Sequence, residues 1–323
     1  MISSLLVRET ACTDPYENLA LEQALLESVR PGTCILYLWQ NENTVVIGKN
    51  QNPWKECKTA LLQQEGGKLA RRLSGGGAVF HDLGNLNFTF LMAQEDYCLD
   101  KQLKVIQTAL TGLNIPCQLS GRNDIVADGR KFSGNAFYKN GKQAYHHGTL
   151  LVNADMDKLS RYLSPSRAKL QAKGVDSVRS RVVNLREFRP DLTIEMLKSS
   201  LISAFSKVYG LKAAPMPSSI PGPDRVSLLA ERNRSWEWNF GQKLPFTLEC
   251  EDRFPWGSLH IQLQVESGII HSAMVFTDAM DWSLAPSLEA LFPGCPFRKD
   301  ALRQRLGIDG PAGDLFRLLE GSL

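Results

Sequence analysis

The stretch of this chain best suited to chemistry is a run of three glycines, Gly75 to Gly77, which two arginines precede and a strand-like Ala-Val-Phe follows. Glycine loses the most backbone entropy on ordering, so it makes poor core material and is used where the backbone turns tightly or lies against a ligand. Adjacent backbone N–H groups with an arginine in reach form a concavity that suits a phosphate or a carboxylate. A flexible hairpin loop is the other interpretation, and the flanking residues favour the anion site.

The glycine run matches neither of the common phosphate-binding loops. No G-x-x-x-x-G-K-[ST] motif occurs in the chain. The segment 74–77 also lacks the G-x-G-x-x-G spacing of a dinucleotide site and follows no βαβ opening. Because the run lies between two β-rich segments, 68–72 and 79–92, we expect a hairpin-like strand–loop–strand that holds a nucleotide on the face of an antiparallel or mixed sheet.

A lysine in a second block could complete such a site. Asp128-Gly129 and Asn140-Gly141 are hairpin turn signals, so a strand is predicted to start near Lys131. The residues that follow, 133–136, are small and leave room for a ligand beside the ammonium group. A solvated surface lysine is the alternative interpretation.

The elements that must position these residues alternate between strands and helices. Asp14, Pro15 and Glu17 predict the start of a helix with an N-cap acid, a first-turn proline and a capping-box glutamate. Further helices are expected at 58–65, 100–113, 155–162 and 193–209. Strands are expected at 1–7, at 34–39 paired with 44–48, and throughout 117–153. Strands arriving in runs with helices interspersed predict an α+β fold.

A second, smaller domain is predicted after a boundary near 241–246. The segment 259–265 alternates between apolar and polar residues, a second strand follows at 269–276, and helices are expected at 286–292 and 299–306. We therefore expect domains at 1–242 and 247–323. The aromatic pair Trp236 and Trp238, just before the boundary, is predicted to pack between the domains, a ligand cage being the alternative.

Composition describes an ordinary globular protein. The 323 residues are 43% hydrophobic and 22% charged, with a formal net charge of +3. That charge is too small to argue for nucleic acid. Seven cysteines without a C-x-x-C pair, and an opening segment too short for a signal peptide, predict reduced thiols in the cytoplasm. No apolar run approaches membrane-spanning length, so neither a nucleic acid nor a membrane is expected as a partner.

Two histidine pairs invite a metal interpretation, which the sequence disfavours. Adjacent residues of a strand point to opposite faces, so His146 and His147 are not expected to share one metal, and no metal held by the protein is predicted. A Mg²⁺ ion bound mainly by nucleotide phosphates and water is expected instead. Cys57 and Cys117 are expected to be buried small hydrophobic residues.

Six blocks together resemble the signature of the lipoate–protein ligase A family, within the biotin/lipoate protein ligase superfamily. They are Arg-Arg-x-Ser-Gly-Gly-Gly-Ala-Val-Phe-His-Asp-x-Gly-Asn at 71–85, and the segments 121–124, 131–134, 146–151, 173–182 and 235–241. The blocks occur in order with family-like spacing, from about Asp14 to the tail. The resemblance implies a large mixed-sheet catalytic domain of the biotin/lipoyl ligase type and a smaller α+β C-terminal domain, in agreement with the predicted boundary.

The resemblance also implies a two-step reaction. Lipoate and ATP, with Mg²⁺, would give lipoyl-AMP and pyrophosphate, and a specific lysine of an acceptor protein would then take the lipoyl group. Acceptors in the family are the lipoyl domains of 2-oxoacid dehydrogenase complexes and the H protein of glycine cleavage. None of the seven cysteines lies in a signature block, so we expect an adenylate and not a thioester intermediate.

The resemblance implies roles for individual residues. Lys131 is the expected catalytic residue, bound both to the adenylate and to lipoate. The other expected ATP- and adenylate-binding residues are Arg72, Gly77, Ala78, Val79 and Phe80. The other expected lipoate-binding residues are Ser74, Gly75 and Gly76. The expected adenylate-covering loop includes Lys173, Gly174, Val178, Arg179 and Val182. Val79, Phe80 and the segment 134–136 are expected to wall the apolar tail of lipoate, and no base for the acceptor lysine is assigned.

Three other functions stay open at this point. A lipoyltransferase that uses preformed lipoyl-AMP would carry nearly the same motifs, although the complete C-terminal domain and the 173–182 loop favour a full ligase. A related ligase for biotin or octanoate would differ in pocket shape. A non-catalytic nucleotide- or RNA-binding protein would need a basic face that this mildly charged chain does not display. The preferred acceptor and the oligomeric state do not follow from the sequence.

Overall fold

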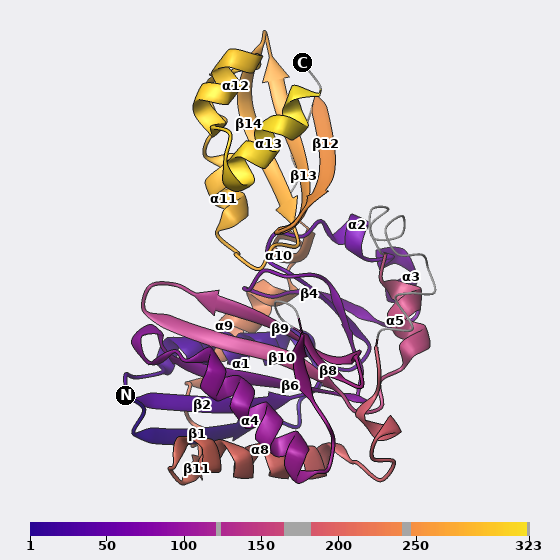
Figure 1. Ribbon diagram of the computed structural model, residues 1–323, viewed down its shortest axis with the longest axis vertical. Coiled ribbons are helices and arrows are strands. Elements are labelled where there is room, and N and C mark those ends of the chain that lie inside the picture. The colour runs from indigo at the N-terminus through magenta and orange to yellow at the C-terminus, as the bar shows by residue number, and fades with distance from the viewer. Residues whose placement is uncertain (121–123, 165–181, 241–246, 322–323) are drawn as a thin grey trace.

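The computed structural model describes residues 1–120, 124–164, 182–240 and 247–321. These residues form a large part built on an eight-stranded sheet and a smaller C-terminal sheet domain that lies above it in Figure 1. The expected mixed α+β architecture with a smaller C-terminal domain is confirmed. The boundary that we predicted between 242 and 247 falls on residues outside the described ranges.

The central sheet is mixed. Its strands, in spatial order, are β11 (Ala213–Pro215), β1 (Ser4–Glu9), β2 (Thr33–Trp39), β6 (Asn85–Ala93), β10 (Gln143–Leu151), β9 (Arg130–Lys139), β8 (Asp124–Ala127) and β7 (Gln118–Ser120). β1 runs parallel to β2 and β11, and the other neighbouring pairs are antiparallel. Tight turns at Asp128-Gly129 and Gly141, all with positive φ, join β8 to β9 and β9 to β10 as expected.

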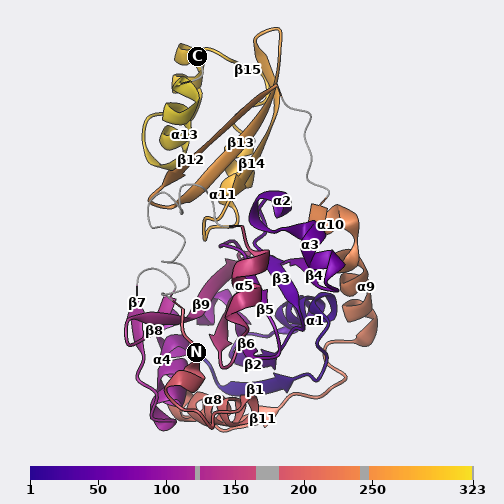
Figure 2. The same ribbon diagram turned by 90° about the vertical axis from the view of Figure 1, so that its right-hand side faces the viewer.

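Two pairs of helices cover the two faces of this sheet. α4 (Leu99–Gly112) and α8 (Ile194–Tyr209) bury one face around Phe88, Phe90 and Phe205. α1 (Pro15–Ser28) and α9 (Pro223–Arg234) lie on the other side (Figure 2). Because side chains alternate along a strand, β6 sends Phe88 and Phe90 to the α4 face and Leu91 to the α1 face.

A second, three-stranded sheet carries the segments that flank the glycine run. Its order is β4 (Lys68–Arg71), β3 (Thr44–Ile47) and β5 (Val79–His81), with β3 parallel to β4 and antiparallel to β5. The sheet packs on two short helices, α3 (Thr59–Gln64) and α5 (Met156–Tyr162), and the one-turn helix α2 (Pro53–Glu56) precedes α3.

Two predicted strand pairings are therefore wrong. β2 and β3 belong to different sheets, and β4 and β5 flank β3 and do not form a hairpin with each other. The physical reason is that all four residues of β3 are buried, so this strand takes the central position and is paired on both edges. The glycine run has to cross from one edge of the small sheet to the other. The expected single strand at 79–92 is also split, because Asp82 turns the chain by accepting a bond from the Gly84 N–H.

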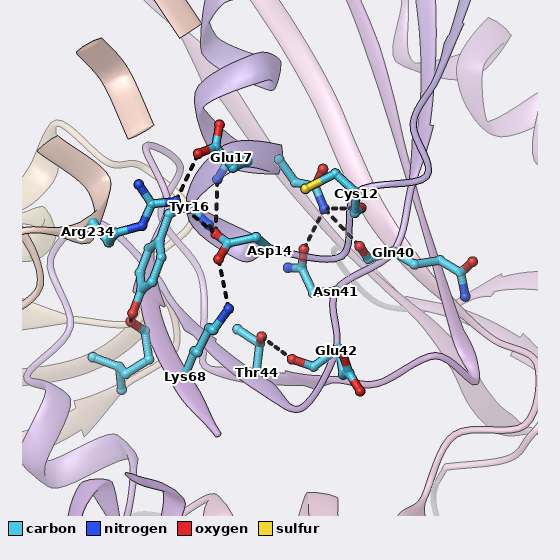
Figure 3. Close-up of polar contacts among 12 residues, drawn as sticks. Cys12, Asp14, Tyr16, Glu17, Gln40, Asn41, Glu42, Thr44, Lys68 and Arg234 are labelled. Atoms are coloured by element: carbon cyan, nitrogen blue, oxygen red, sulfur yellow. Dashed lines mark hydrogen bonds and ion pairs between the residues drawn. The ribbon is translucent and has the colours of Figure 1, made fainter. Parts of the chain in front are cut away.

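α1 begins where the sequence predicts. The carboxylate of Asp14 accepts hydrogen bonds from the backbone N–H groups of Tyr16 and Glu17, and Pro15 occupies the first turn. Lys68 at the start of β4 donates to the same carboxylate over 2.7 Å (Figure 3). Arg234, the last residue of α9, pairs with Glu17 over 2.8 Å. The cap therefore also joins α1 to the small sheet.

The C-terminal domain has its own core. β12 (Leu248–Phe254), β13 (Gly257–Glu266), β14 (Ile269–Thr277) and β15 (Cys295–Pro296) form an antiparallel sheet, and α11 (Leu284–Glu289), α12 (Lys299–Leu306) and α13 (Gly310–Glu320) pack on it. β13, β14, α11 and α12 were expected, whereas β12 and β15 were not predicted. α13 was not predicted either; it opens on Gly310, Pro311 and Gly313, residue types that disfavour helix interiors.

In the described ranges, the elements not yet named are one short helix and two single turns, α10 (Trp236–Phe240), η1 (Gln94–Asp96) and η2 (Leu185–Glu187). Trp238 of α10 donates to the Arg71 carbonyl, and Lys49 and Arg232 lie over its ring at 3.8 and 4.1 Å. These contacts lie inside the large part of the molecule, so the expected packing of this tryptophan between domains is corrected.

Among the described helices, none combines the length and the apolarity needed to cross a bilayer.

The cap of α1 gives a stability prediction. Replacing Asp14 with Ala removes the acceptor for two helix N–H groups and should lower the free energy of unfolding by about 1–2 kcal/mol. Asp14→Asn keeps the capping oxygen and loses the ion pairs with Lys68 and Arg234, which are 43% and 46% exposed, so it should cost less than about 1 kcal/mol. Urea denaturation of the two variants measures the difference, and equal losses would contradict the capping role.

Candidate active site

The site is a cavity of about 530 Å³ on the α1 side of the central sheet. The strand register defines its floor. Trp39, Asn87 and Thr149 lie in one row across β2, β6 and β10, and the Gly134 N–H of β9 donates to the Thr149 hydroxyl. His147 lies in the neighbouring row of the same sheet face, opposite Thr89 of β6. The walls come from α1, the small sheet, the glycine run and the C-terminal domain.

One arginine holds the glycine run in shape. Arg72 is 5% exposed, and its guanidinium donates to the carbonyls of Val46, Gly75 and Gly77 and to the hydroxyl of Ser74. Burial lowers its pKa to about 10, so it stays charged at neutral pH. Arg72 also lines the cavity. In this structure most of its donors serve the loop, so its first role is to orient the backbone that a ligand would meet.

The neighbouring arginine points away from the cavity. Arg71 donates to the carbonyls of Gly48, Lys49 and Gln51, and through its other nitrogens to those of Trp238 and Asn239. Successive residues of a strand face opposite sides, so only one residue of the Arg-Arg pair can serve the cavity. Arg71 instead ties the segment after β3 to α10.

Ser74 belongs to a buried polar network that crosses the floor. Its Oγ lies 2.9 Å from His147 Nε2, and His147 Nδ1 lies 2.8 Å from Glu22 Oε1. Thr89 also donates to Glu22, over 2.7 Å. Although a serine, a histidine and a carboxylate in this order resemble a hydrolytic triad, the Ser74 side chain is fully buried and accepts a bond from Arg72. The network therefore braces the glycine run against the sheet.

Glu22 was not predicted as a site residue, although its position in the sequence of α1 is unusual for a carboxylate. It lies three residues after Leu19 and three before Leu25, inside the apolar stripe of α1, and its side chain is only 3% exposed. A carboxylate at a core-facing helical position needs a partner, and the partner is His147. The two adjacent histidines do face opposite sides of β10, as predicted: His146 contacts Gln102 and Asn135 on the α4 side.

Lys131 reaches the cavity from the start of β9. Its Nζ lies 3.2 Å from the position that a Cβ on Gly134 would occupy, so the ammonium group lies directly over this small residue. Val182 pairs with Lys131 through an isolated bridge, and the Val183 N–H donates to the Lys131 carbonyl. Of the expected covering loop, only Val182 is described; Lys173, Gly174, Val178 and Arg179 lie outside the described residues.

The other residues assigned to the adenylate divide into two groups. Gly77, Ala78 and Val79 line the cavity. The ring of Phe80 does not, because alternation along β5 turns it into the core beside Tyr162, 5.5 Å between ring centroids. The expectation that this side chain walls the acyl tail is therefore wrong, and only its backbone can face a ligand.

The C-terminal domain closes the top of the cavity over the glycine run. The Gly76 N–H donates to the Ala279 carbonyl over 2.9 Å, and Gly76 has a φ of +89°, which favours glycine. Met280 also lines the cavity. On the large part, Asn50 accepts from the Thr277 N–H and donates to the Trp282 carbonyl. The segment 277–282 is thus held to the large part at several points.

This domain also contributes charge that the sequence did not reveal. Arg253 and Asp278 line the mouth of the cavity and lie 3.5 Å apart. The Asp278 carboxylate also accepts from the Ser258 N–H. Nothing in the local sequence marks these residues, because their place at the cavity depends on how the domain docks. Within the described residues, no three or more His, Cys, Asp or Glu side chains come together as a metal site.

Comparisons with known proteins identify what this fold and cavity resemble. The family model of the lipoyl protein ligase A/B catalytic domain matches residues 14–206, and that of the bacterial lipoate protein ligase C-terminus matches residues 243–310. The crystal structure of LipL1 from P. falciparum in complex with lipoate is 28% identical, with a TM-score of 0.83 over 99% of this chain and 98% of that chain.

Two further solved structures match about three quarters of this chain. One is a bipartite lipoate protein ligase solved with its E2 lipoyl domain from Thermoplasma acidophilum, 27% identical with a TM-score of 0.64. It covers 77% of this chain and 100% of that chain. The other is a lipoate-protein ligase A bound with ATP, 26% identical with a TM-score of 0.63, covering 75% of this chain and 100% of that chain.

The docking of the small domain on the glycine run gives a second prediction. A Cβ on Gly75 would lie 2.3 Å from the Ala279 carbonyl oxygen, whereas a Cβ on Gly77 would meet no atom within 4 Å. Gly75→Ala should therefore cost about 1–3 kcal/mol of stability or loosen the junction. Gly77→Ala, the matched control, should stay within about 0.5 kcal/mol of the parent. Thermal unfolding and limited proteolysis near 277–282 measure both, and a tolerated Gly75→Ala would refute the close contact.

Proposed function

This chain belongs to the lipoate–protein ligase family, and we propose that it activates lipoate with ATP and transfers the lipoyl group to a lysine of an acceptor protein. The observation that carries the proposal is the position of Lys131. Its ammonium group lies over Gly134 in a cavity whose far end is lined by the buried apolar side chains of Leu19, Trp39 and Val46. Such a cavity suits a ligand with an anionic head and an apolar tail.

The first step joins two anions. A carboxylate oxygen of lipoate attacks the α-phosphorus of ATP, pyrophosphate leaves, and the product is the mixed anhydride lipoyl-AMP. Bringing the two anions together needs a cation between them. Lys131 can bind both the carboxylate and the α-phosphate, and it stabilises the charge that develops as pyrophosphate leaves. Arg72 adds positive potential at closer range than any surface residue because it is buried beside the cavity.

Backbone groups supply the rest of the nucleotide site. β5 is an edge strand of the small sheet, so its outer N–H and C=O groups are available to a flat heterocycle. We assign the adenylate to the backbone of Gly77, Ala78, Val79 and Phe80 and to Lys131 and Arg72. Ser74, Gly75 and Gly76 shape the lipoate side. The segment 173–182 covers the adenylate in this proposal, and its far end lies beside Lys131 at Val182.

Magnesium would enter with the nucleotide and neutralise phosphate charge. Among the described residues, Asp278 is the carboxylate that lines the cavity. It is engaged by Arg253 and by the Ser258 N–H. We therefore assign no ligand from the protein to Mg²⁺ and place it on phosphate oxygens and water.

In the second step the ε-amine of the acceptor lysine attacks the acyl carbon of lipoyl-AMP. An amide bond forms, AMP leaves, and the amine loses one proton. We propose lipoyl domains of 2-oxoacid dehydrogenase complexes and the glycine cleavage H protein as acceptors. The archaeal relative solved with its E2 lipoyl domain supports this choice. We assign catalysis to residues 1–242, an accessory role to 247–323, and the reaction to the cytoplasm, where the seven free cysteines would stay reduced.

The alternative is a transferase that uses preformed lipoyl-AMP. Lipoate-dependent exchange of labelled pyrophosphate into ATP, without acceptor, separates the two. Exchange that requires lipoate supports the full ligase. Absence of exchange, together with transfer from synthetic lipoyl-AMP to a lipoyl domain, would assign the protein to the transferases.

Lys131 gives a prediction for the same assay. Lys131→Ala should lower turnover in pyrophosphate exchange by roughly 10²–10³, the usual effect of removing one transition-state donor. Lys142→Ala, in the exposed turn between β9 and β10, is the matched control and should exchange at the parent rate. A Lys131→Ala variant that folds and exchanges normally would remove this lysine from the mechanism.

A further inference from the structure

The deep end of the cavity holds a histidine with an unused polar atom. His81 is 4% exposed, lines the cavity and packs against the edge of Trp39, with ring centroids 6.1 Å apart. Its Nδ1 lies 3.2 Å from Asn41 Nδ2. Its Nε2 is buried, and no polar atom among the described residues pairs with it. Buried polar atoms of this kind are rare and point to a missing partner.

The tautomer of His81 follows from a chain of hydrogen bonds that starts at the backbone. The Asn18 amide nitrogen donates to the carbonyls of Cys12 and Gln40, at 3.0 and 2.8 Å, so the orientation of this amide is fixed. The same nitrogen lies 3.0 Å from Asn41 Oδ1, so its two hydrogens are shared among these three oxygen acceptors. Asn41 must therefore present its Nδ2 to His81, and His81 Nδ1 must accept.

A neutral histidine that accepts at Nδ1 carries its proton on Nε2. His81 is neutral because burial, with Arg72 and His147 nearby, lowers its pKa to about 3. Nε2–H is thus a hydrogen-bond donor of fixed polarity. Asn87, in the floor row next to Trp39, adds an amide with one unpaired atom: its Oδ1 accepts from Asn85, and its Nδ2 has no partner among the described residues.

His81, packed on Trp39, lies at the end of the cavity farthest from Lys131. The row from Gly134 to Trp39 crosses three strand spacings, about 14 Å. The lining residues at the Trp39 end are almost fully buried, whereas Arg253 at the mouth is 38% exposed. A ligand whose carboxylate meets Lys131 therefore puts its tail beside Leu19, Trp39 and His81.

We propose that His81 is a specificity-determining residue, which selects acyl groups whose far end carries a hydrogen-bond acceptor and disfavours plain alkyl tails. The inference rests on the proposed function and deepens it. The ring sulfurs of lipoate are weak acceptors and can receive the Nε2–H bond. The methyl end of octanoate cannot, and it leaves a buried donor unpaired, which is unfavourable.

Three acids separate hydrogen bonding from shape. Lipoate has the sulfur ring, 5-cyclopentylpentanoate has a ring of the same size without sulfur, and octanoate has neither. For the wild-type protein, kcat/KM in acid-dependent pyrophosphate exchange should favour lipoate over the cyclopentyl acid by roughly 3- to 10-fold, the range of one modest hydrogen bond. A ratio within twofold would overturn the proposal, because ring shape alone would then explain any preference over octanoate.

Two variants test the assignment to His81. His81→Phe keeps a planar ring and removes the donor, so the lipoate to cyclopentyl ratio should fall to within twofold. Leu19→Ala, the matched control, enlarges the same end without removing a donor, so it should weaken both ring acids and leave their ratio unchanged. A ratio that survives in folded His81→Phe would overturn the proposal. If that variant does not fold, the wild-type ratio decides.

Equilibrium binding of the three acids without ATP makes the outcome independent of the proposed function. The ratio of the Kd values for the cyclopentyl acid and lipoate should again be roughly 3- to 10-fold. Binding with this preference but without exchange would refute the ligase activity and support the role of His81. Exchange together with binding that lacks this preference would support the ligase activity and refute the role of His81.

Discussion

The site depends on the way one buried guanidinium holds a backbone that has no side chains of its own. A run of glycines cannot pack itself into a single shape, because nothing but the main chain is present to be held. Arg72 supplies the constraint by donating to the carbonyls of Gly75 and Gly77 within the run and to that of Val46 on β3. Its donors are fixed in a planar fork, which a lysine could not reproduce. The loop is therefore rigid where a ligand would lie against it, and the cost of burying the charge is offset by these bonds.

The register of the central sheet decides the rest of the cavity. One strand, β10, sends His146 into the core and His147 to the floor, and a shift of one residue would exchange them. His147 then joins Glu22 of α1 to Ser74 of the glycine run. The same floor thus supports the loop from below while Arg72 holds it from the side. The cavity owes its shape to long-range pairings, although its chemistry is carried by short motifs.

The features that depend on short sequence motifs could be predicted from the sequence, whereas the features that depend on long-range pairing could not. Helix starts such as Asp14, turns such as Asp128-Gly129 and the place of Lys131 at a strand start depend on neighbours in sequence, and all three agree with the structure. The pairing of β3 depends on which strand is buried on both faces, which local patterns do not report. Arg253 reaches the cavity only because a separate domain docks there. Phe80 was misplaced because a motif conveys that a residue matters, but not whether its side chain or its backbone faces the ligand.

The contact between Gly76 and Ala279 joins the two parts of the protein through main-chain atoms alone. Every residue except proline offers the same carbonyl and the same N–H. The residue at position 279 can therefore change during evolution without loss of this bond, as long as the course of the backbone is kept. Homologues that share no side chain at this position could still dock their domains in the same way. A comparison of sequences would then overlook a junction that a comparison of backbones would find.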